Sequence, residues 1–483
     1  MTHPLLHTQS YIHGRWTDAS ANRRYTVVNP ATGETLAELA DCSPSDAESA
    51  IEAAHSALAD WKQHTAKARA QILRRWFDLI MQHQDSLAEL MTLECGKPLA
   101  ESKGEVAYGA SFIEWFAEEG KRAYGDAIPT HAADKRVFAI KQPVGVCTAI
   151  TPWNFPLAMI TRKVGPALAA GCTMVVKPAE ATPFTALALA QLGEEAGLPA
   201  GVLNIVTASS GKAVGEVLST HPLVRKVSFT GSTPVGKQLI KQAADSVKRV
   251  SMELGGNAPF IVFDDADLDA AIDGAIASKY RNTGQTCVCV NRFIVQEGIY
   301  DQFAQKLAKR SQRLKVGNGL DDGVQQGPLI NAAGLEKVET LLKDATDNGA
   351  KILTGGQRHS LGGNFFEPTV LTGITPAMRI SQEEIFGPLA AITPFKTEAD
   401  AIRLANDTPF GLAAYFYSGN LARIWRVAEA LEYGMVGINE GLISTEIAPF
   451  GGVKESGLGR EGSHYGLDEY LEIKYLCLGG LDR

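Results

Sequence analysis

The strongest constraint on the fold is a repeating pattern that begins near residue 143. Short apolar runs alternate there with longer stretches of helical periodicity. Such alternation is typical of strand–helix–strand units, whose strands lie mainly parallel in an open, Rossmann-type sheet. The runs that predict the strands of this sheet are Val144–Ile150, Thr173–Val176, Val202–Val206, Val224–Phe229 and Arg249–Leu254.

A second α/β series follows the first, and the chain ends in a strand-like tail at Glu469–Leu478 that has no helix partner of its own. A length of 483 residues also exceeds what one hydrophobic core usually supports, so several domains are expected. The tail is predicted to complete another sheet. The apolar runs of the second series are Ala258–Phe263, Phe293–Val295, Ala390–Thr393, Ala413–Tyr417 and Met435–Asn439.

The first 140 residues are predicted to be mostly helical. Ser43, followed by Pro44 and by Asp46, is the expected N-cap of a helix that runs to about Gln63. Helical spacing of apolar residues predicts a second helix over Lys67–Glu94 and a third over Leu99–Lys121.

Charge and cysteine content exclude several classes of protein. There are 46 basic and 54 acidic residues, so the basic footprint of a nucleic-acid-binding chain is missing. No run of about 18 apolar residues predicts a membrane span. The segment Met1–Ser10 has no Lys or Arg and resembles no signal or transit peptide. Seven scattered cysteines do not suggest a disulfide framework, so a cytoplasmic location is expected.

Two glycine-rich segments resemble nucleotide-binding motifs without meeting all their requirements. Gly231–Lys237 has P-loop spacing, but Gln238 stands where a hydroxyl would hold magnesium, so ATP hydrolysis is not expected. Its backbone N–H groups could still face the phosphates of a cofactor. Gly457–Gly462 has the letters of a dinucleotide fingerprint, but too little chain follows it. The histidines form no zinc motif, so no metal site is predicted.

Cys287 and Glu253 are candidates for chemistry. Cys287 lies in a glycine-containing polar turn after a predicted helix. A free thiol has a pKa of about 8.5, so a nucleophilic role needs a base or a lowered pKa. Glu253, at a strand end before two glycines, is the candidate base. The alternatives are an inert packing cysteine and a surface glutamate.

The ends of two further strands carry candidate binding residues. Asn154 lies between two prolines after the first strand, where its amide could donate to an oxyanion or could simply stabilise a turn. Lys177 and Glu180 follow the next strand, at the position where an acidic residue binds ribose hydroxyls. A solvated ion pair is the alternative for these two residues.

Seven motifs, in this order, resemble those of the NAD(P)-dependent aldehyde dehydrogenases, and the resemblance runs from about Tyr11 to Gly480. The motifs are PWNFP with Asn154, KPAE with Lys177, FTGS at Phe229–Ser232, MELGG with Glu253, GQTC with Cys287, EEIFGP with Glu384 and Phe386, and PFGGVKESGLGRE at 449–461.

The resemblance implies an aldehyde dehydrogenase-like α/β fold with three parts. A Rossmann-type NAD-binding domain is expected to cover 1–125 and 143–254, and a second α/β domain, the catalytic one, 255–448. A small oligomerisation extension is expected to comprise 126–142 and 449–483. The family further implies a homodimer or homotetramer that acts on a small molecule, with no nucleic-acid or membrane partner.

The resemblance also implies a mechanism without metal. Cys287 attacks the aldehyde, the Asn154 amide and the Cys287 N–H hold the oxyanion, a hydride passes to the nicotinamide, and Glu253 activates the water that hydrolyses the thioester. The residues implied to bind the cofactor are Trp153, Asn154, Lys177, Pro178, Ala179, Glu180, Gly231, Ser232, Leu254, Glu384 and Phe386.

Glu180 favours NAD as the cofactor over NADP. A carboxylate that pairs with the ribose 2′-hydroxyl repels a 2′-phosphate. NADP is the alternative, since Lys177 could tolerate a phosphate.

Within the superfamily, local motifs around Cys287 and at 159–164, 441–445 and 468–475 resemble succinate-semialdehyde dehydrogenases. The implied reaction converts succinate semialdehyde (4-oxobutanoate) to succinate, in 4-aminobutyrate degradation. Arg162, Arg281 and Ser444 are implied to bind the distal carboxylate. Glutarate semialdehyde and 2-oxoglutarate semialdehyde are alternative substrates, because one methylene gives little discrimination. A non-catalytic binding protein on this fold is the remote alternative.

Cys289 has two interpretations. It is either a packing residue or, as in some relatives of this type, the partner of Cys287 in a reversible disulfide that switches activity off under oxidation.

Overall fold

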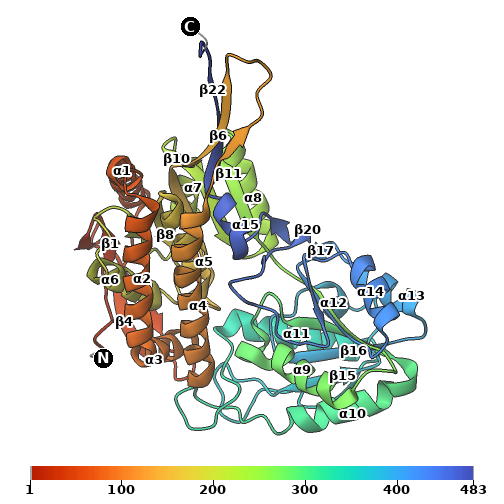
Figure 1. The fold of residues 1–483 in the computed structure, drawn as a ribbon. Coiled ribbons are helices and arrows are strands. Elements are labelled where there is room, and N and C mark those ends of the chain that lie inside the picture. Colours follow the sequence, from red (N-terminus) through yellow and green to blue (C-terminus); the bar gives the residue numbers. More distant parts are fainter. Residues whose placement is uncertain (1–2, 482–483) are drawn as a thin grey trace.

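The computed structural model describes residues 3–481, so the predicted outer domain limits at 1 and 483 lie outside the described residues. Two large sheets dominate the chain, and a small third sheet projects from it at the top of Figure 1. The mixed α/β architecture predicted from the alternating pattern is confirmed.

The first large sheet has eight strands, and its five central ones are parallel. All five predicted strands of the first series are present in it. In spatial order the strands are β2 (Arg15–Thr17), β1 (Ser10–Ile12), β9 (Leu203–Ile205), β8 (Thr173–Lys177), β7 (Val146–Ile150), β10 (Val224–Thr230), β11 (Arg249–Glu253) and β21 (Gly457–Leu458).

Helices cover both faces of this sheet because alternate strand residues point in opposite directions. Cys147 and Met174 pack in one core cluster with apolar residues of α2, α4, α5 and α6, whereas Val146 and Val175 pack in another with residues of α1, α7 and α8. The helices are α1 (Pro44–Trp61), α2 (Ala66–Gln82), α3 (Gln84–Cys95), α4 (Leu99–Glu119), α5 (Ala158–Ala170), α6 (Phe184–Glu195), α7 (Gly211–Thr220) and α8 (Thr233–Ala244).

Two details of the helical prediction can be compared directly. Ser43 caps α1 in a reciprocal capping box with Asp46, as predicted. The single helix predicted over 67–94 is wrong, because α2 and α3 are separate. His83 between them has φ −97° and ψ 16°, outside the helical range. The break lets the apolar faces of both helices reach the same core.

The second large sheet has seven strands, all parallel except the edge strand β14. Its strands, in spatial order, are β14 (Lys351–Thr354), β15 (Thr369–Thr372), β16 (Leu389–Phe395), β13 (Val290–Gln296), β12 (Ala258–Val262), β18 (Ala413–Tyr417) and β19 (Met435–Ile438). Its helices are α9 (Leu268–Tyr280), α10 (Tyr300–Ser311), α11 (Ala332–Asp347), α12 (Arg379–Gln382), α13 (Glu398–Asn406) and α14 (Leu421–Ala430).

The small sheet joins distant parts of the chain. Its order is β22 (Leu471–Leu478), β6 (Arg136–Pro143), β5 (Asp126–Ile128), and all pairs are antiparallel. The tail strand thus pairs within its own chain, while β21 from the same C-terminal region joins the first large sheet. The remaining elements are β3 (Arg24–Val28) with β4 (Thr35–Ala40), β17 (Phe410–Gly411) with β20 (Val453–Lys454), α15 (Ser463–Asp468), and short 3₁₀ turns at Gly120–Arg122, Arg281–Gly284 and Glu297–Ile299.

No helix within 3–481 is both long enough and apolar enough to cross a membrane.

Candidate active site

Two adjoining cavities lie at the carboxyl ends of the first sheet's strands, where ligands collect in open α/β folds. The first, about 370 Å³, contains Cys287 and is called the Cys287 cavity. The second, about 420 Å³, contains Lys177 and is called the Lys177 cavity. Both are lined by Trp153, Gly231 and Ser232. A larger cavity of about 690 Å³ lies elsewhere, around Arg292, and contains none of the predicted site residues.

The structure brings the three predicted catalytic residues together around the Cys287 cavity. Asn154 arrives from the loop after β7, Glu253 from the end of β11, and Cys287 from the turn after α9. The two large sheets therefore contribute one wall each, which places a thiol, a carboxyl and an amide around one space.

The Cys287 turn has an unusual backbone. Asn282 and Thr283 have φ of 48° and 62°, and Gly284 has φ of 78°. A Cβ on Gly284 would lie 2.3 Å from the Gly387 carbonyl oxygen, so only glycine fits there. This tight turn carries Cys287 to the cavity.

Cys287 is a neutral thiol in this environment. Burial raises its pKa to about 12; the Arg162 guanidinium lowers that pKa, and Glu384 and Glu253 raise it. Since the reactive form is the thiolate, Cys287 needs a base that removes its proton as it attacks.

Glu253 and Glu461 are two neighbouring buried carboxyls with opposite behaviour. Burial and the nearby Glu461 raise the pKa of Glu253 well above its ordinary value. Burial also opposes ionisation of Glu461, but ion pairs with Arg162 and Lys163 lower the pKa of that carboxyl. Glu461 is therefore the ionised member of the pair and Glu253 the one that favours the protonated form, a separation typical of acid–base sites.

The Asn154 amide has one hydrogen bond and one open side. Its Nδ2 donates to the Gln285 carbonyl at 3.0 Å. Its Oδ1 has no hydrogen-bond partner among the residues that the structure describes. One N–H is thus left to face a ligand in the cavity.

The Lys177 cavity fits the adenosine and phosphate part of a dinucleotide. Lys177 is buried, and its Nζ lies 3.0 Å from the Pro178 carbonyl and 3.5 Å from the exposed Glu180 carboxylate. Ala179 lines the same cavity. Ser232 precedes α8 without a side-chain cap within the described chain, so first-turn N–H groups of α8 are open to a phosphate.

Two further residues that the resemblance implies to bind the cofactor, Leu254 and Phe386, line the Cys287 cavity. The Phe386 ring packs edge-on against Trp153, with centroids 5.7 Å apart. Glu384 Oε1 accepts the Gly256 N–H at 3.1 Å. Burial raises the pKa of Glu384 to about 7, and the Gly256 N–H lowers it.

The three residues predicted to bind a substrate carboxylate have different environments. Arg281 and Ser444 line one small crevice beside Thr286. Arg162 is buried, paired with Glu461 and stacked 4.0 Å from the Phe450 ring centre. Its Nη2 has no hydrogen-bond partner within residues 3–481.

Cys289 points to a different place from Cys287. Its Sγ donates to the Lys279 carbonyl at 3.3 Å and lines the crevice of Arg281 rather than the Cys287 cavity. Both thiols are free here. The redox-switch alternative stays a prediction, and it requires the Cys289 side chain to turn.

Sequence reasoning missed several charged residues of this site. Lys163 and Glu461 were contained in quoted motifs but received no role, because their pairing spans 298 positions. Nor did the sequence indicate a role for Lys97 and Asn282, which donate to the Asn154 carbonyl, or for Glu105, which pairs with Lys97. No group of three or more metal-ligating side chains occurs in the part of the chain that the structure describes.

Comparison with known proteins agrees with this geometry. The model of the aldehyde dehydrogenase family matches residues 16–476. The chain is 61% identical over 475 residues to succinate-semialdehyde dehydrogenase [NADP(+)] GabD of Escherichia coli, covering 98% of each chain. It is 60% identical over 477 residues to glutarate-semialdehyde dehydrogenase of Pseudomonas aeruginosa, covering 99% of each.

A solved structure gives the same result. The crystal structure of succinate-semialdehyde dehydrogenase from Burkholderia pseudomallei superposes with a TM-score of 0.98 at 61% identity, covering 99% of this chain and 100% of that one. The chain is a member of the aldehyde dehydrogenase family. Similar members of that family include enzymes named for succinate semialdehyde and for glutarate semialdehyde.

Proposed function

We propose that this chain oxidises succinate semialdehyde to succinate as an NAD(P)+-dependent aldehyde dehydrogenase. The observation that carries the proposal is the convergence of Cys287, Glu253 and Asn154 on the Cys287 cavity, which adjoins the Lys177 cavity. The names of the similar enzymes support the same reaction class.

Acylation begins at Cys287. Its sulfur attacks the aldehyde carbon, and the thiol proton passes to a base, for which Glu253 is the nearby carboxyl. The aldehyde oxygen becomes an oxyanion that accepts the free Asn154 N–H and the Cys287 backbone N–H. Each such donor is typically worth about 10²–10³ in rate. A bound nicotinamide would supply the hydride acceptor for oxidation of the adduct carbon, chemistry that no side chain here provides.

Deacylation depends on Glu253. After the proton taken from Cys287 has been released to solvent, the ionised carboxylate removes a proton from water. The hydroxide so formed adds to the thioester carbon, and the Cys287 sulfur leaves as a thiolate that takes the proton back from the Glu253 carboxyl. Because burial and the nearby Glu461 raise the pKa of Glu253, its carboxylate is a stronger base than that of an ordinary glutamate. The product is the free carboxylic acid rather than a thioester of an external thiol.

NAD is the cofactor that we propose as preferred. Glu180 lies beside Lys177 in the Lys177 cavity. There its carboxylate would repel the 2′-phosphate of NADP. Lys177 and the first turn of α8 would hold phosphates of either cofactor. The Escherichia coli relative is named for NADP(+), which supports the broader NAD(P) class.

The substrate carboxylate is proposed to bind Arg281 and Ser444, with the unpaired Nη2 of Arg162 as a further donor. Glutarate semialdehyde is the second candidate substrate, favoured by the Pseudomonas aeruginosa relative. The proposed location is the cytoplasm. The proposed assembly is a dimer or tetramer through the small sheet, where Ile473 and Tyr475 are exposed.

The test is NADH and NADPH formation by the reduced protein with succinic, glutaric and 2-oxoglutaric semialdehydes. Turnover fastest on the four-carbon substrate, and lost in Cys287→Ala, supports the proposal. Faster turnover on a longer semialdehyde would keep the chemistry and replace the substrate. A protein inactive on all aldehydes would return the non-catalytic alternative.

A further inference from the structure

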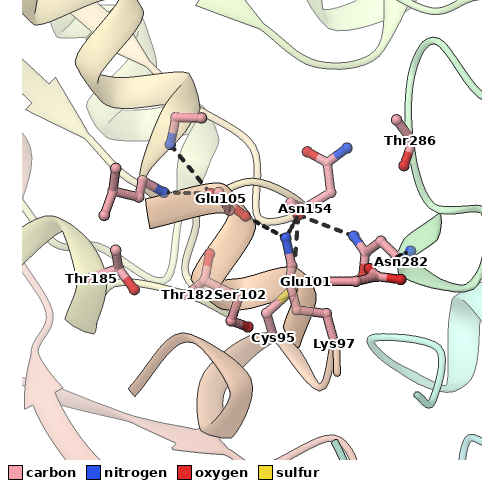
Figure 2. A network of polar contacts seen from close by, with 12 residues as sticks. Cys95, Lys97, Glu101, Ser102, Glu105, Asn154, Thr182, Thr185, Asn282 and Thr286 are labelled. Carbon is pink, nitrogen blue, oxygen red and sulfur yellow. Dashed lines mark hydrogen bonds and ion pairs between the residues drawn. The ribbon is translucent and has the colours of Figure 1, made fainter. Parts of the chain in front are cut away.

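A group of buried polar side chains outside the proposed catalytic set meets at Asn154 (Figure 2). Lys97 lies in the turn between α3 and α4, and Glu105 lies on α4. Their side chains are 0% and 1% exposed and form an ion pair. Two unhydrated charges are costly to bury, so they are expected where their further bonds have a use.

Lys97 and Glu105 hold the backbone from the Asn154 carbonyl to the start of α5. Lys97 Nζ donates to the Asn154 carbonyl at 2.6 Å. Glu105 Oε1 accepts the N–H groups of Leu157 at 2.9 Å and Ala158 at 3.2 Å, at the start of α5. Lys97 and Glu105 therefore fix the loop after β7 at two points, the Asn154 carbonyl and the first N–H groups of α5.

Asn282 connects the same carbonyl to the turn that carries the nucleophile. Its Nδ2 donates to the Asn154 carbonyl at 3.0 Å, and its backbone N–H donates to the partly buried Glu101 carboxylate at 2.8 Å. The Asn154 amide in turn donates to the Gln285 carbonyl at 3.0 Å. The Asn154 carbonyl thus joins the helical layer to the Cys287 turn.

The orientation of the Asn154 side chain matters because few of its hydrogen-bond donors are free. One of its two amide N–H groups is occupied by Gln285, so a single N–H remains for the oxyanion. A hydrogen bond weakens steeply when its angle departs from linear, so that N–H must be aimed accurately.

We propose that Lys97 is a positioning residue. Its ammonium group fixes the Asn154 carbonyl and so aims the Asn154 side-chain N–H at the oxyanion that forms when the Cys287 sulfur adds to a carbonyl group. This inference rests on the proposed function, because it assigns Lys97 a role only if Asn154 stabilises an oxyanion.

Two cofactor-free reactions of Cys287 separate positioning from structural support. With p-nitrophenyl acetate, the Cys287 sulfur loses its proton to a base and adds to the ester carbonyl. An oxyanion forms, p-nitrophenolate leaves, and an acetyl thioester results. With iodoacetamide, the sulfur displaces iodide at a saturated carbon and no oxyanion forms. Acylation is followed by p-nitrophenolate release and alkylation by mass spectrometry of the Cys287 peptide.

Lys97→Met should lower the acylation rate at least tenfold and leave the alkylation rate within about threefold of the wild type. Asn154→Ala should show the same selective loss, and a larger one, because it removes the donor itself. The proposal is overturned if Lys97→Met slows both reactions equally or slows neither.

Lys226→Met is the matched control. Lys226 is equally buried and bonded to Glu469 and Ser251, away from the Cys287 cavity. It should lower the melting temperature as Lys97→Met does, without a selective loss of acylation. A selective loss in Lys226→Met would show that any buried lysine has this effect, which would overturn the proposal.

Should Lys97→Met fail to fold, Asn282→Ala tests the same carbonyl by removing another of its donors. A smaller selective loss of acylation is expected, and equal or absent effects on the two reactions would contradict the proposal. Asn154→Ala distinguishes the two levels of inference. If that variant shows no selective loss, the oxyanion role within the proposed function fails; if it does and Lys97→Met does not, only the role of Lys97 fails.

Discussion

The two cavities differ in how their charged groups meet water. Around the Cys287 cavity, Glu253 and Glu461 are 3% and 4% exposed, and their protonation depends on neighbouring charges. In the Lys177 cavity, the Glu180 side chain is 56% exposed. Solvent screens charge strongly at the second place and weakly at the first. Single substitutions of charged residues around the Cys287 cavity are therefore expected to change the rate strongly, whereas those in the Lys177 cavity should change it only a few-fold.

The largest effect is expected from Glu253→Gln. The variant keeps the shape of the side chain but removes the base, so kcat should fall by about 10²–10⁴. The acyl adduct on Cys287 should then accumulate and be visible in the intact mass.

The pH dependence of this base gives a second readout. Because the pKa of Glu253 is raised, the wild-type kcat should increase with pH as the carboxyl loses its proton, and this increase should be absent in the variant. A variant with wild-type kcat would exclude Glu253 as the deacylation base.

Glu384 lines the Cys287 cavity. The substitution Glu384→Gln measures how much burial of this carboxyl costs in the free energy of unfolding. A pKa raised to about 7 means that folding favours the protonated carboxyl. The stabilisation is complete below the ordinary pKa of about 4.5 and is lost as the pH rises through 7. The variant should gain about 2–3 kcal/mol relative to wild type at pH 8 and almost none near pH 4.

Urea unfolding of both proteins at the two pH values checks this difference. A gain that is equal at both pH values would instead indicate a packing effect of the amide.

Arg281→Ala should distinguish substrates by their charge. Loss of a charge-assisted hydrogen bond is worth about 1.5–3 kcal/mol, so kcat/KM for succinate semialdehyde should fall by roughly 10–100-fold. Propanal, which has no distal carboxylate, is the control substrate and should be affected only a few-fold. Equal losses on both substrates would mean that Arg281 supports the turn rather than the substrate.

The smallest effect is expected at the exposed end. Glu180→Ser removes a screened charge worth about 1 kcal/mol at 4 Å, so the NADP-to-NAD ratio of kcat/KM should rise about fivefold. Glu216→Ser removes another acidic side chain of the same cavity and is the matched control. If both variants change the ratio equally, general charge rather than the position of Glu180 sets the preference.

Features that depend on neighbouring residues in the sequence could be predicted from it. Strands of the first sheet and the residues just after them were predictable, because hydrophobic runs and strand-end motifs are local signals. Lys177, Glu180, Gly231 and Glu253 all belong to this group.

The rest depended on pairing across the chain. Glu461 is 299 positions from Arg162, and Lys97 reaches a carbonyl 57 positions away, so no local pattern indicates either contact. The break at His83 was missed for a related reason. Apolar periodicity continues through it, and only the packing of α2 and α3 against one core shows where the helix ends.

The shared wall of Trp153, Gly231 and Ser232 has a consequence for ligand design. Two fragments, one seated in each cavity, would lie next to each other across that wall. Joined by a short linker, the second fragment binds at an effective concentration in the millimolar range instead of at its bulk concentration. A nucleoside fragment in the Lys177 cavity, tethered to a short chain in the Cys287 cavity, would therefore gain affinity without any new contact, and its selectivity would come from the residues that line the Cys287 cavity.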